Sequence, residues 1–463
     1  MDPWGLSALS LASKSLATVS ARHGRSLPQA RFSGEEPPCP EKYALKPNTH
    51  RRPVMKIALA NNYYYLRGGS ERVLFEDQKA LEALGHEVRP FAQYDEKNHA
   101  ASSAAFFPRI ADYRTAGPAG RAKAAIDIVY SSSVGRAFAA FLDDFHPDVV
   151  HCHNIYGHLT TAILDEAKRR HIPTVLTVHD QKLVCPAYLG LRQGKPCQLC
   201  QDGGYWRCIR WKCHKQSYAA SLVYTAESYF NRLGGKYDAV SRFLCPSRFM
   251  QNSLIDSGMA ESRTSYHPNA LAPGDYVPCF EPGDYVLYVG RLSAEKGLLT
   301  LLAALEQTDI PLRIAGTGPL EAEVREQIRA RGLAVQMEGY CAGERLSELF
   351  RNSAFTVVPS EWFENASMSV LESFAYGKPV LAANIGGNPE LVVDGVTGRQ
   401  FSSGNVEELA EVAREMWENR DELNNMGRRA RSLIERQFNQ ERRIADLLSI
   451  YSHVSGHLAM KER

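Results

Sequence analysis

The sequence predicts an α/β fold with two domains, each built on a sheet of parallel strands. Apolar runs typical of buried strands alternate with glycine-containing loops and with segments whose apolar residues recur at helical spacing. This pattern occurs first over residues 57–84 and again over residues 285–305. A Pro- and Gly-rich run over residues 273–283 lies between the two series and is typical of a linker. We therefore expect the domain boundary near residue 271.

The composition is that of an ordinary globular protein. The 463 residues are enough for two or three domains, and 44% of them are hydrophobic. The formal net charge of +2, from 54 basic and 52 acidic side chains, gives no reason to expect nucleic-acid binding. No run of about 18 or more apolar residues occurs, so we expect no transmembrane helix and a cytoplasmic protein.

Residues 1–53 differ from the rest of the chain. They are rich in Ser, Ala, Arg and Pro and show no periodic apolar face, which predicts a disordered leader. A strand-like run begins at Met55, so residues 1–53 are alternatively a mis-assigned start of translation. In either case the first folded domain is expected over residues 54–270.

The first domain begins with a predicted strand over residues 57–61. Gly68, Gly69 and Ser70 follow it and open a helix that ends near Gly85. A strand, a glycine loop and a helix in this order place backbone N–H groups at the carboxyl edge of the sheet. There they can bind a phosphate or an acceptor hydroxyl.

Histidines follow two further strands of this domain. Residues 174–178 form a predicted strand that ends at His179, where the imidazole can bond a neighbouring loop or face a ligand. His151, His153 and His158 lie on or after the strand at residues 148–153. They are weaker candidates, which line the acceptor side or simply occupy the strand end.

An insert at residues 185–214 shows neither helix nor strand periodicity, and a loop of this length needs something to hold it. Four thiolates can bind a structural zinc, and a Cys-x2-Cys pair is half of the usual zinc spacing. An iron–sulfur cluster is a less favoured alternative, and disulfides or ordinary buried thiols are the others. The insert holds half of the ten cysteines: Cys185, Cys197, Cys200, Cys208 and Cys213.

The same insert mixes aromatic and basic side chains, among them Trp206, Arg207, Arg210, Trp211 and Lys212. Such a mixture suits peripheral contact with an anionic membrane, where a lipid-linked acceptor would be found; the protein would then act at the inner face of the membrane. A small aromatic core surrounded by solvated cations explains the same residues at least as well.

The second domain, residues 271–438, repeats the pattern of strand, loop and helix. Arg291 and Lys296 lie between a predicted strand at residues 285–289 and a predicted helix at residues 298–305. Two cations at a strand end and a helix start can converge on a pyrophosphate. Gly316 and Gly318 form a turn after the next strand, where glycine allows close approach of the backbone.

Two carboxylates lie on either side of a predicted helix start in this domain. An apolar run at residues 355–359 breaks into a loop that contains Glu364, and a helix beginning at Ser367 carries Glu372. Because ligands gather outside the carboxyl ends of parallel strands, both glutamates are expected at one crevice. Carboxylates accept hydrogen bonds from sugar hydroxyls and a helix N-terminus binds phosphate, so the pattern favours a nucleotide-sugar.

Five motifs, in this order along residues 55–455, resemble those of the family 4 retaining glycosyltransferases. One departure is the run Asn365-Ala366-Ser367, where relatives often have Gly or Pro. The motifs are Gly68-Gly69-Ser70-Glu71-Arg72, the Thr-Val-His-Asp setting of His179, residues 290–297, the turn at residues 316–319, and Glu364-x7-Glu372 with Gly386-Gly387-Asn388-Pro389-Glu390 after it.

The resemblance implies the GT-B arrangement, in which two Rossmann-like domains face a cleft and a final helix, residues 439–456, crosses back to the first domain. It implies retaining transfer of a sugar from a nucleotide diphosphate-sugar to a carbohydrate or lipid-linked hydroxyl, in polysaccharide, cell-envelope or glycolipid synthesis. No metal is then required for catalysis. The implied catalytic residues are His179 and Glu364; the donor-binding residues are Arg291, Lys296, Gly316, Gly318, Ser367, Met368, Ser369 and Glu372; the acceptor or phosphate loop is Gly68, Gly69 and Ser70.

Two other functions fit the same fold. A GT-B nucleotide-sugar epimerase would convert the donor alone, but it needs acid–base carboxylates in the first domain that the sequence does not identify. A non-catalytic descendant that binds carbohydrate or a partner protein would keep the fold and lose site residues, all of which are present here. The nucleotide base, the sugar and the acceptor are not determined by the sequence.

Overall fold

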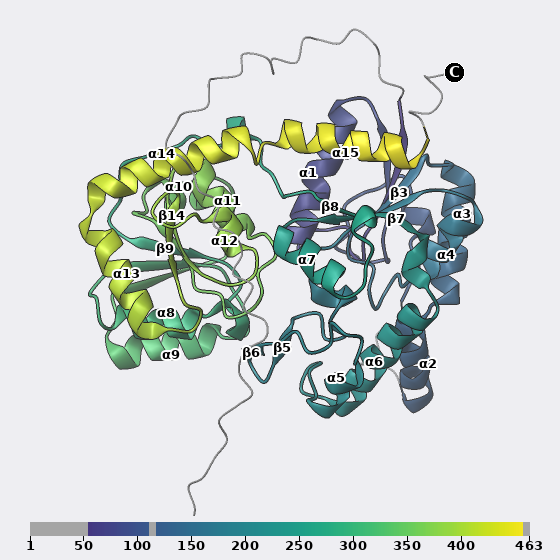
Figure 1. Cartoon of the computed structure of the whole chain (residues 1–463), viewed down its shortest axis with the longest axis horizontal. Helices are drawn as coiled ribbons and strands as arrows, with labels where there is room; N and C mark the ends of the chain where they lie inside the picture. The colour runs from purple at the N-terminus through teal and green to yellow at the C-terminus, as the bar shows by residue number, and fades with distance from the viewer. Residues whose placement is uncertain (1–53, 111–116, 457–463) are drawn as a thin grey trace, which may run out of the picture. The chain divides into compact units, whose positions relative to one another are not determined.

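The computed structural model describes residues 54–110 and 117–456 and contains two six-stranded sheets (Figure 1). Every pair of neighbouring strands in the two sheets is parallel. Helices alternate with the strands along the chain. The predicted α/β fold is confirmed. The leader predicted for residues 1–53 lies outside the described residues.

The first sheet has the strand order β2-β1-β3-β4-β7-β8. The chain adds β2 on one side of β1 and then places β3 on the other, so the β1/β3 boundary is the topological switch point. Its strands are β1 (Lys56–Ala60), β2 (Glu87–Phe91), β3 (Val149–Cys152), β4 (Thr174–Thr177), β7 (Val240–Cys245) and β8 (Thr264–Tyr266), and its helices are α1 (Gly69–Ala83), α2 (Pro118–Val129), α3 (Ser132–Phe145), α4 (Ala162–Arg169), α6 (Tyr218–Leu233) and α7 (Arg248–Asp256).

The second sheet has the order β11-β10-β9-β12-β13-β14, which places its switch point between β9 and β12. The helix predicted over residues 298–305 is found at those bounds. The strands are β9 (Val286–Val289), β10 (Leu312–Ala315), β11 (Val335–Gly339), β12 (Thr356–Val358), β13 (Val380–Ala383) and β14 (Gly398–Phe401), and the helices are α8 (Leu298–Leu305), α9 (Glu321–Arg331), α10 (Gly343–Arg351), α11 (Met368–Ala375), α12 (Asn388–Leu391), α13 (Val406–Glu418) and α14 (Arg420–Arg436).

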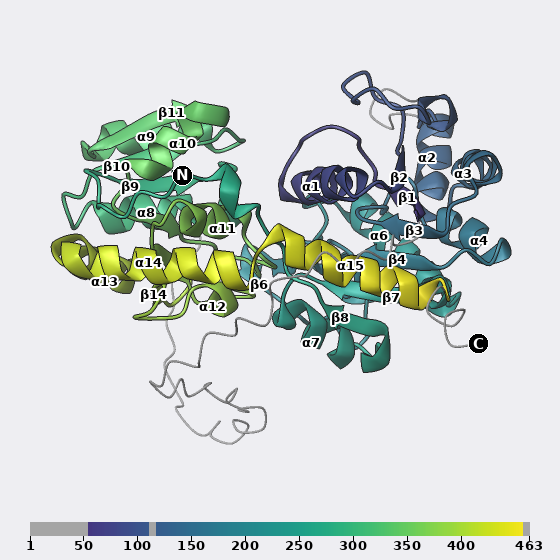
Figure 2. The same cartoon turned by 90° about the horizontal axis from the view of Figure 1, so that it is seen from above.

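The last helix, α15 (Gln440–Val454), belongs to the core of the first sheet although it follows the second sheet in sequence. It lies beside α1 (Figures 1 and 2). Its apolar face, Ile444, Leu447, Leu448 and Tyr451, is buried with the strands of the first sheet. The spacing of these residues places them on one side of the helix, so burial of that side attaches α15 to the first sheet.

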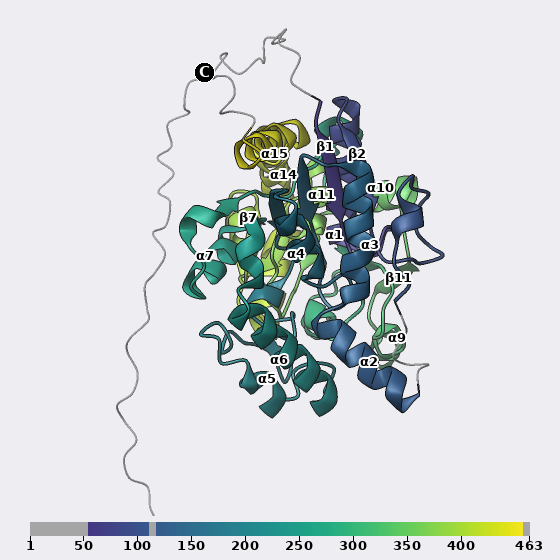
Figure 3. The same cartoon turned by 90° about the vertical axis from the view of Figure 1, so that its right-hand side faces the viewer.

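The cysteine-rich insert is more structured than its sequence predicts. It contains the antiparallel pair β5 (Leu191–Arg192) and β6 (Lys195–Pro196) and the short helix α5 (Trp206–Arg210). Positive φ angles at Gly190, Gly194 and Gly203 turn the chain between these elements, which are too short to give a periodic apolar pattern. Helices α2 and α5 both pack against α6 (Figure 3).

No single helix within residues 54–110 and 117–456 combines the length and the apolar composition of a membrane span. Only α2 and α3 taken together, with a bend of 51° between them, meet the length and composition of a span.

Candidate functional site

Glu364 and Lys296 form an ion pair at the switch point of the second sheet. Lys296 ends a short 3-10 helix after β9, and Glu364 lies in the loop after β12. Nζ of Lys296 lies 2.7 Å from Oε1 of Glu364, and the Ser360 hydroxyl donates to the same oxygen at 2.6 Å. Burial would raise the pKa of Glu364, but the Lys296 ammonium and the Ser360 hydroxyl hold that pKa below its usual value. Glu364 is therefore ionised at neutral pH.

Arg291 is the other cation that follows β9, and it is exposed. Among the residues that the structure describes, none bonds or pairs with its guanidinium. The turn at Gly316 and Gly318 packs directly on the Arg291 loop: a Cβ at Gly316 would lie 1.9 Å from the Gly290 oxygen, and one at Gly318 would lie 2.3 Å from the Leu292 oxygen. These glycines hold the loop, and the guanidinium stays available to an anionic ligand.

Glu372 is buried on α11 and pairs with Arg72, which lies 300 residues earlier on α1. Nη2 of Arg72 also donates to the Tyr276 hydroxyl at 2.8 Å. Burial raises the pKa of Glu372, and the charge of Arg72 opposes this only in part. The ion pair between Arg72 and Glu372 brings the first turn of α1, which includes Ser70, close to the Glu372 carboxylate on α11.

The N-termini of α1 and α11 face each other. A Cβ added to Gly69 would lie 3.4 Å from Cγ of Met368. Neither helix has a side-chain cap, and the Ser367 hydroxyl bonds the Ser369 hydroxyl at 2.9 Å instead. The first N–H groups of both helices therefore lack intrahelical partners, and two positive helix ends meet at one place. This arrangement suits an anion such as a diphosphate.

Asn365 connects the Glu364 loop to the first sheet. Its Nδ2 donates to the Val178 oxygen at 2.7 Å, and its Oδ1 accepts from the Ser247 hydroxyl at 2.6 Å. Val178 directly precedes His179, so the loops of His179 and Glu364 are joined by a buried hydrogen bond. Asn365, which belongs to the run that departs from the family pattern, therefore joins the two loops.

His179 is held by the buried imidazole of His153. Its Nε2 lies 2.9 Å from Nδ1 of His153, and the two rings stack with centroids 5.1 Å apart. Burial, and then the positive charge of Arg443, lowers the pKa of His179 to about 3, so the ring is neutral at physiological pH. His151 bonds the Tyr451 hydroxyl at 2.6 Å and the Thr177 hydroxyl at 2.8 Å.

His151 and His153 are fully buried, so they support His179 and do not line an exposed acceptor surface. His158 is only partly buried, and its Nε2 lies 3.2 Å from the Tyr63 hydroxyl. Of the four histidines, His179 and His158 are the ones with solvent-accessible surface in this structure.

Two family models match consecutive parts of the chain. The model for Glycosyltransferase Family 4 matches residues 67–273, and the model for Glycosyl transferases group 1 matches residues 279–433. The chain belongs to the family 4 glycosyltransferases.

A curated relative of this glycosyltransferase is O-antigen chain mannosyltransferase C from Escherichia coli. It is 31% identical over 172 residues, which are 36% of this chain and 46% of the relative. The match spans about half the length of such curated relatives.

Solved structures share the whole fold. Anabaena Alr3699/HepE in complex with UDP and glucose is 18% identical, with a TM-score of 0.59, and the match covers 86% of this chain and all of that one. Sucrose-phosphate synthase from Thermosynechococcus elongatus is also 18% identical, with a TM-score of 0.65 and coverage of 87% and 100%. At this identity the similarity establishes the GT-B fold.

The zinc site predicted for the insert of this glycosyltransferase is not supported. Within residues 54–110 and 117–456, no three or more His, Cys, Asp or Glu side chains come together as a group able to hold a metal ion. The iron–sulfur alternative has the same requirement for converging thiolates and gains no support either. All nine cysteines in that part of the chain are free thiols.

Three residues with clear roles at the site are missed by the sequence reasoning: Arg72, Asn365 and Tyr451. Arg72 ends the Gly-Gly-Ser-Glu-Arg motif, so its place in the motif is a usable signal. Asn365 is visible only as a departure from the family pattern. Nothing in the sequence indicates that Tyr451, on the last helix, bonds His151.

Proposed function

We propose that this glycosyltransferase moves a sugar from a nucleotide diphosphate-sugar to a hydroxyl acceptor, with retention of the anomeric configuration. Residues 271–438 would bind the donor and residues 54–270 the acceptor. The observation that carries the proposal is the gathering of two cations, two helix N-termini and two buried glutamates between the ends of the two sheets.

The positive groups fit the donor diphosphate. Arg291 and Lys296 would contact its oxygens, with the N-termini of α1 and α11 supplying backbone N–H groups through Gly69 and Ser369. Because the bond to the sugar breaks with charge developing on the leaving diphosphate, fixed positive groups at that position lower the barrier. Lys296 is bonded to Glu364 in the structure, so one of its other two N–H groups would serve the phosphate.

The two glutamates fit the sugars of the donor. Glu372 would accept hydrogen bonds from the ribose hydroxyls, and Arg72 keeps its carboxylate oriented. Glu364 and His179 would contact the transferred sugar. A neutral His179 can donate from one ring nitrogen while its Nε2 bonds His153.

Retention is supported by membership of family 4. The ionised Glu364 would stabilise positive charge that develops on the sugar ring. The donor would be a uridine or other nucleoside diphosphate-sugar, since Alr3699/HepE is a structure with UDP and glucose. The acceptor class, a polysaccharide, cell-envelope or glycolipid hydroxyl, is supported by the relationship to O-antigen chain mannosyltransferase C.

Peripheral contact with an anionic membrane is proposed for the face made by α5 and the start of α6. Trp206, Tyr218 and Leu222 are 54%, 58% and 56% exposed there. Lys212 lies over the Tyr218 ring at 4.4 Å, so cationic and aromatic groups are interleaved as in membrane-interface segments. Co-sedimentation with anionic but not zwitterionic vesicles, lost in Trp206→Ser, would support this; no binding by the native protein would contradict it.

Product analysis tests the reaction. The purified protein is incubated with a panel of nucleotide diphosphate-sugars, with and without hydroxyl acceptors, and the products are followed by NMR. We expect an acceptor glycoside whose anomeric configuration equals that of the donor. An inverted product refutes retention, and an isomerised donor without acceptor identifies an epimerase instead.

A further inference from the structure

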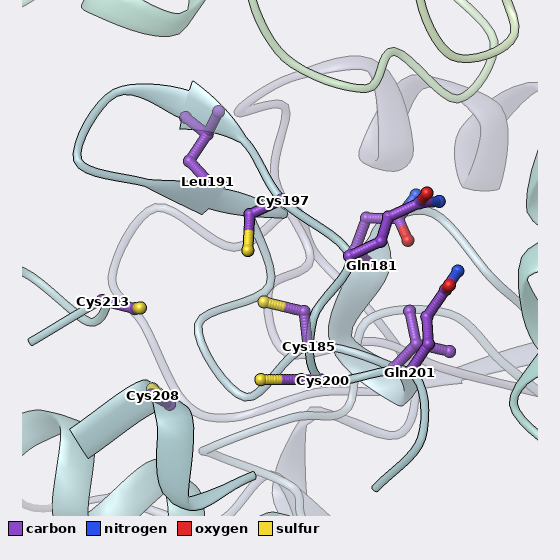
Figure 4. A pocket seen from close by; sticks show the side chains of 10 residues that line it. Gln181, Cys185, Leu191, Cys197, Cys200, Gln201, Cys208 and Cys213 are labelled. Carbon is purple, nitrogen blue, oxygen red and sulfur yellow. The ribbon is translucent and has the colours of Figure 1, made fainter. Parts of the chain in front are cut away.

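Five thiols of the insert line one small cavity. The cavity has a volume of about 20 Å³ and is lined by Cys185, Cys197, Cys200, Cys208 and Cys213 together with Gln181, which precedes the insert, and other neighbouring residues. Figure 4 shows the sulfur atoms of Cys185, Cys197 and Cys200 on one side, facing the segment that carries Cys208 and Cys213. The proposed donor chemistry uses none of these thiols.

The backbones of Cys208 and Cys213 are hydrogen-bonded directly to each other. The backbone N–H of Cys213 donates to the Cys208 oxygen at 3.0 Å, as the chain leaves α5. Such a bond brings the two backbones into the range that a disulfide spans, roughly 4.4–6.8 Å between Cα atoms. The two thiols are close enough to shift each other's pKa, that of Cys208 downward and that of Cys213 upward.

The environment favours a reactive thiolate at Cys208. The neighbouring Cys213 thiol lowers the pKa of Cys208 to about 6, and the nearby Thr225 and Ser221 on α6 act in the same direction against the effect of burial. Cys213 is only partly buried. Burial instead raises the pKa of Cys185 to about 11, so that thiol stays protonated and unreactive.

We propose that Cys208 and Cys213 form a reversible dithiol–disulfide site that is oxidised by hydrogen peroxide. The Cys208 thiolate attacks one peroxide oxygen; an S–O bond forms, the O–O bond breaks, and the hydroxide released takes up a proton to become water. The Cys213 thiol then loses its proton and attacks the sulfenic sulfur. An S–S bond forms, and the S–O bond breaks to release a second water. Two thiols are oxidised by two electrons and one peroxide is reduced.

The cavity is connected to the proposed donor site by direct contacts. Gln181 lines the cavity and follows His179 and Asp180 in the chain. On the other side, the backbone N–H of Cys197 donates to the Gly190 oxygen at 2.7 Å, and a Cβ on Gly190 would lie 3.2 Å from the Phe363 ring. Phe363 precedes Glu364, so a change in the packing of the insert reaches both loops of the site.

Mass spectrometry tests the site directly and independently of the proposed function. Trypsin cleaves after Arg210 and Lys212, so the two cysteines fall on different peptides unless a disulfide joins them. We expect peroxide treatment of the whole chain at neutral pH to remove two alkylatable thiols per molecule and to link these peptides, and a dithiol reductant to reverse both. In Cys213→Ser the disulfide-linked peptides should be absent, and Cys208 should instead react with a sulfenic-acid probe. The control Cys279→Ser, in the linker at residues 273–283, should behave as the native protein.

A disulfide between other cysteines, no loss of thiols, or stoichiometric metal bound to the purified protein would overturn the proposal. A second readout, the rise in melting temperature caused by a nucleotide diphosphate, tests the connection to the donor site and rests on the proposed function. We expect oxidation to reduce that rise several-fold. An equal rise in both redox states refutes the connection, and no rise in the reduced protein refutes the proposed donor site instead.

Discussion

Replacing Arg443 by Ala should remove a large part of the free energy of unfolding. Arg443 on α15 donates to Asp77 on α1 through Nε at 2.9 Å and Nη2 at 2.8 Å, and the two side chains are only 3% and 1% exposed. Its Nη1 also donates to the Pro268 oxygen at 2.6 Å. Removing one partner of a buried ion pair leaves the other charge unpaired and costs about 3–5 kcal/mol. We therefore expect a loss in that range, about a fifth or more of the stability of an ordinary domain.

Urea denaturation of the full chain measures this loss. The neighbouring Arg442 is exposed, and Arg442→Ala should change the free energy of unfolding by no more than about 0.5 kcal/mol. In a double-mutant cycle with Asp77→Ala, the two single losses should not add, because the second substitution removes the unpaired charge that the first creates. A loss in Arg443→Ala within about 1 kcal/mol of that in Arg442→Ala would refute the account of how α15 is attached.

Three further outcomes follow from the structure. Gly386→Ala should abolish donor binding, because a Cβ there would lie 2.3 Å from the backbone oxygen of Glu364. Gly404 also has a positive φ but nothing within 4 Å of its added Cβ, so Gly404→Ala should cost only about 1 kcal/mol of stability. Burial lowers the pKa of His151 to about 4, so the unfolded chain takes up this proton at a higher pH than the folded chain does, and stability is lost as the pH falls from about 6.5 to 4. His151→Gln should therefore reduce the slope of the unfolding free energy against pH by up to about 1.4 kcal/mol per pH unit. The same substitution at the exposed His171 should leave the slope unchanged. Glu372→Gln should weaken binding of nucleotide diphosphates in calorimetry while binding of inorganic pyrophosphate is kept; equal weakening of both would contradict a ribose contact.

Much of the fold follows from local sequence signals. Strands such as β4 and β9 are found within a residue or two of the predicted apolar runs, because a strand buried on both faces has to be continuously apolar. No helix is predicted for residues 118–145, yet α2 and α3 lie there. In α3 the buried residues Phe138, Phe141 and Phe145 recur at helical spacing, so the sequence does carry a signal for this helix.

The contacts that assemble the site depend on distant parts of the chain. Arg72 and Glu372 are 300 residues apart, and only the folded chain brings α1 to α11. Lys296 and Glu364 were both predicted at the site, but their ion pair depends on loops that leave β9 and β12, which are neighbours in space and not in sequence. Residue types and spacing indicate which groups bind a donor, whereas their partners depend on the order of strands in the sheet.

For the cysteines, the sequence indicated a cluster without indicating its chemistry. Spacing alone is compatible with zinc, an iron–sulfur cluster, disulfides or free thiols. The geometry of the insert adds an observation that spacing does not give: Cys213 is bonded through its backbone to Cys208, the pair proposed to react. Short elements such as α5 leave too little pattern for that geometry to be predicted.

The central claim is that Arg291 and its neighbours bind the diphosphate of a nucleotide-sugar, and a thermal-shift panel tests it most directly. UDP, GDP, ADP and TDP are compared, each with its sugar conjugates, on the native protein, Arg291→Ala and Arg329→Ala, an exposed arginine on α9 as control. At about a hundred times the dissociation constant, the ligand should stabilise the native protein by roughly 2.7 kcal/mol. We predict stabilisation by one nucleotide family, retained in Arg329→Ala and lost in Arg291→Ala. Stabilisation that survives in Arg291→Ala, or none with any nucleotide, would contradict the account.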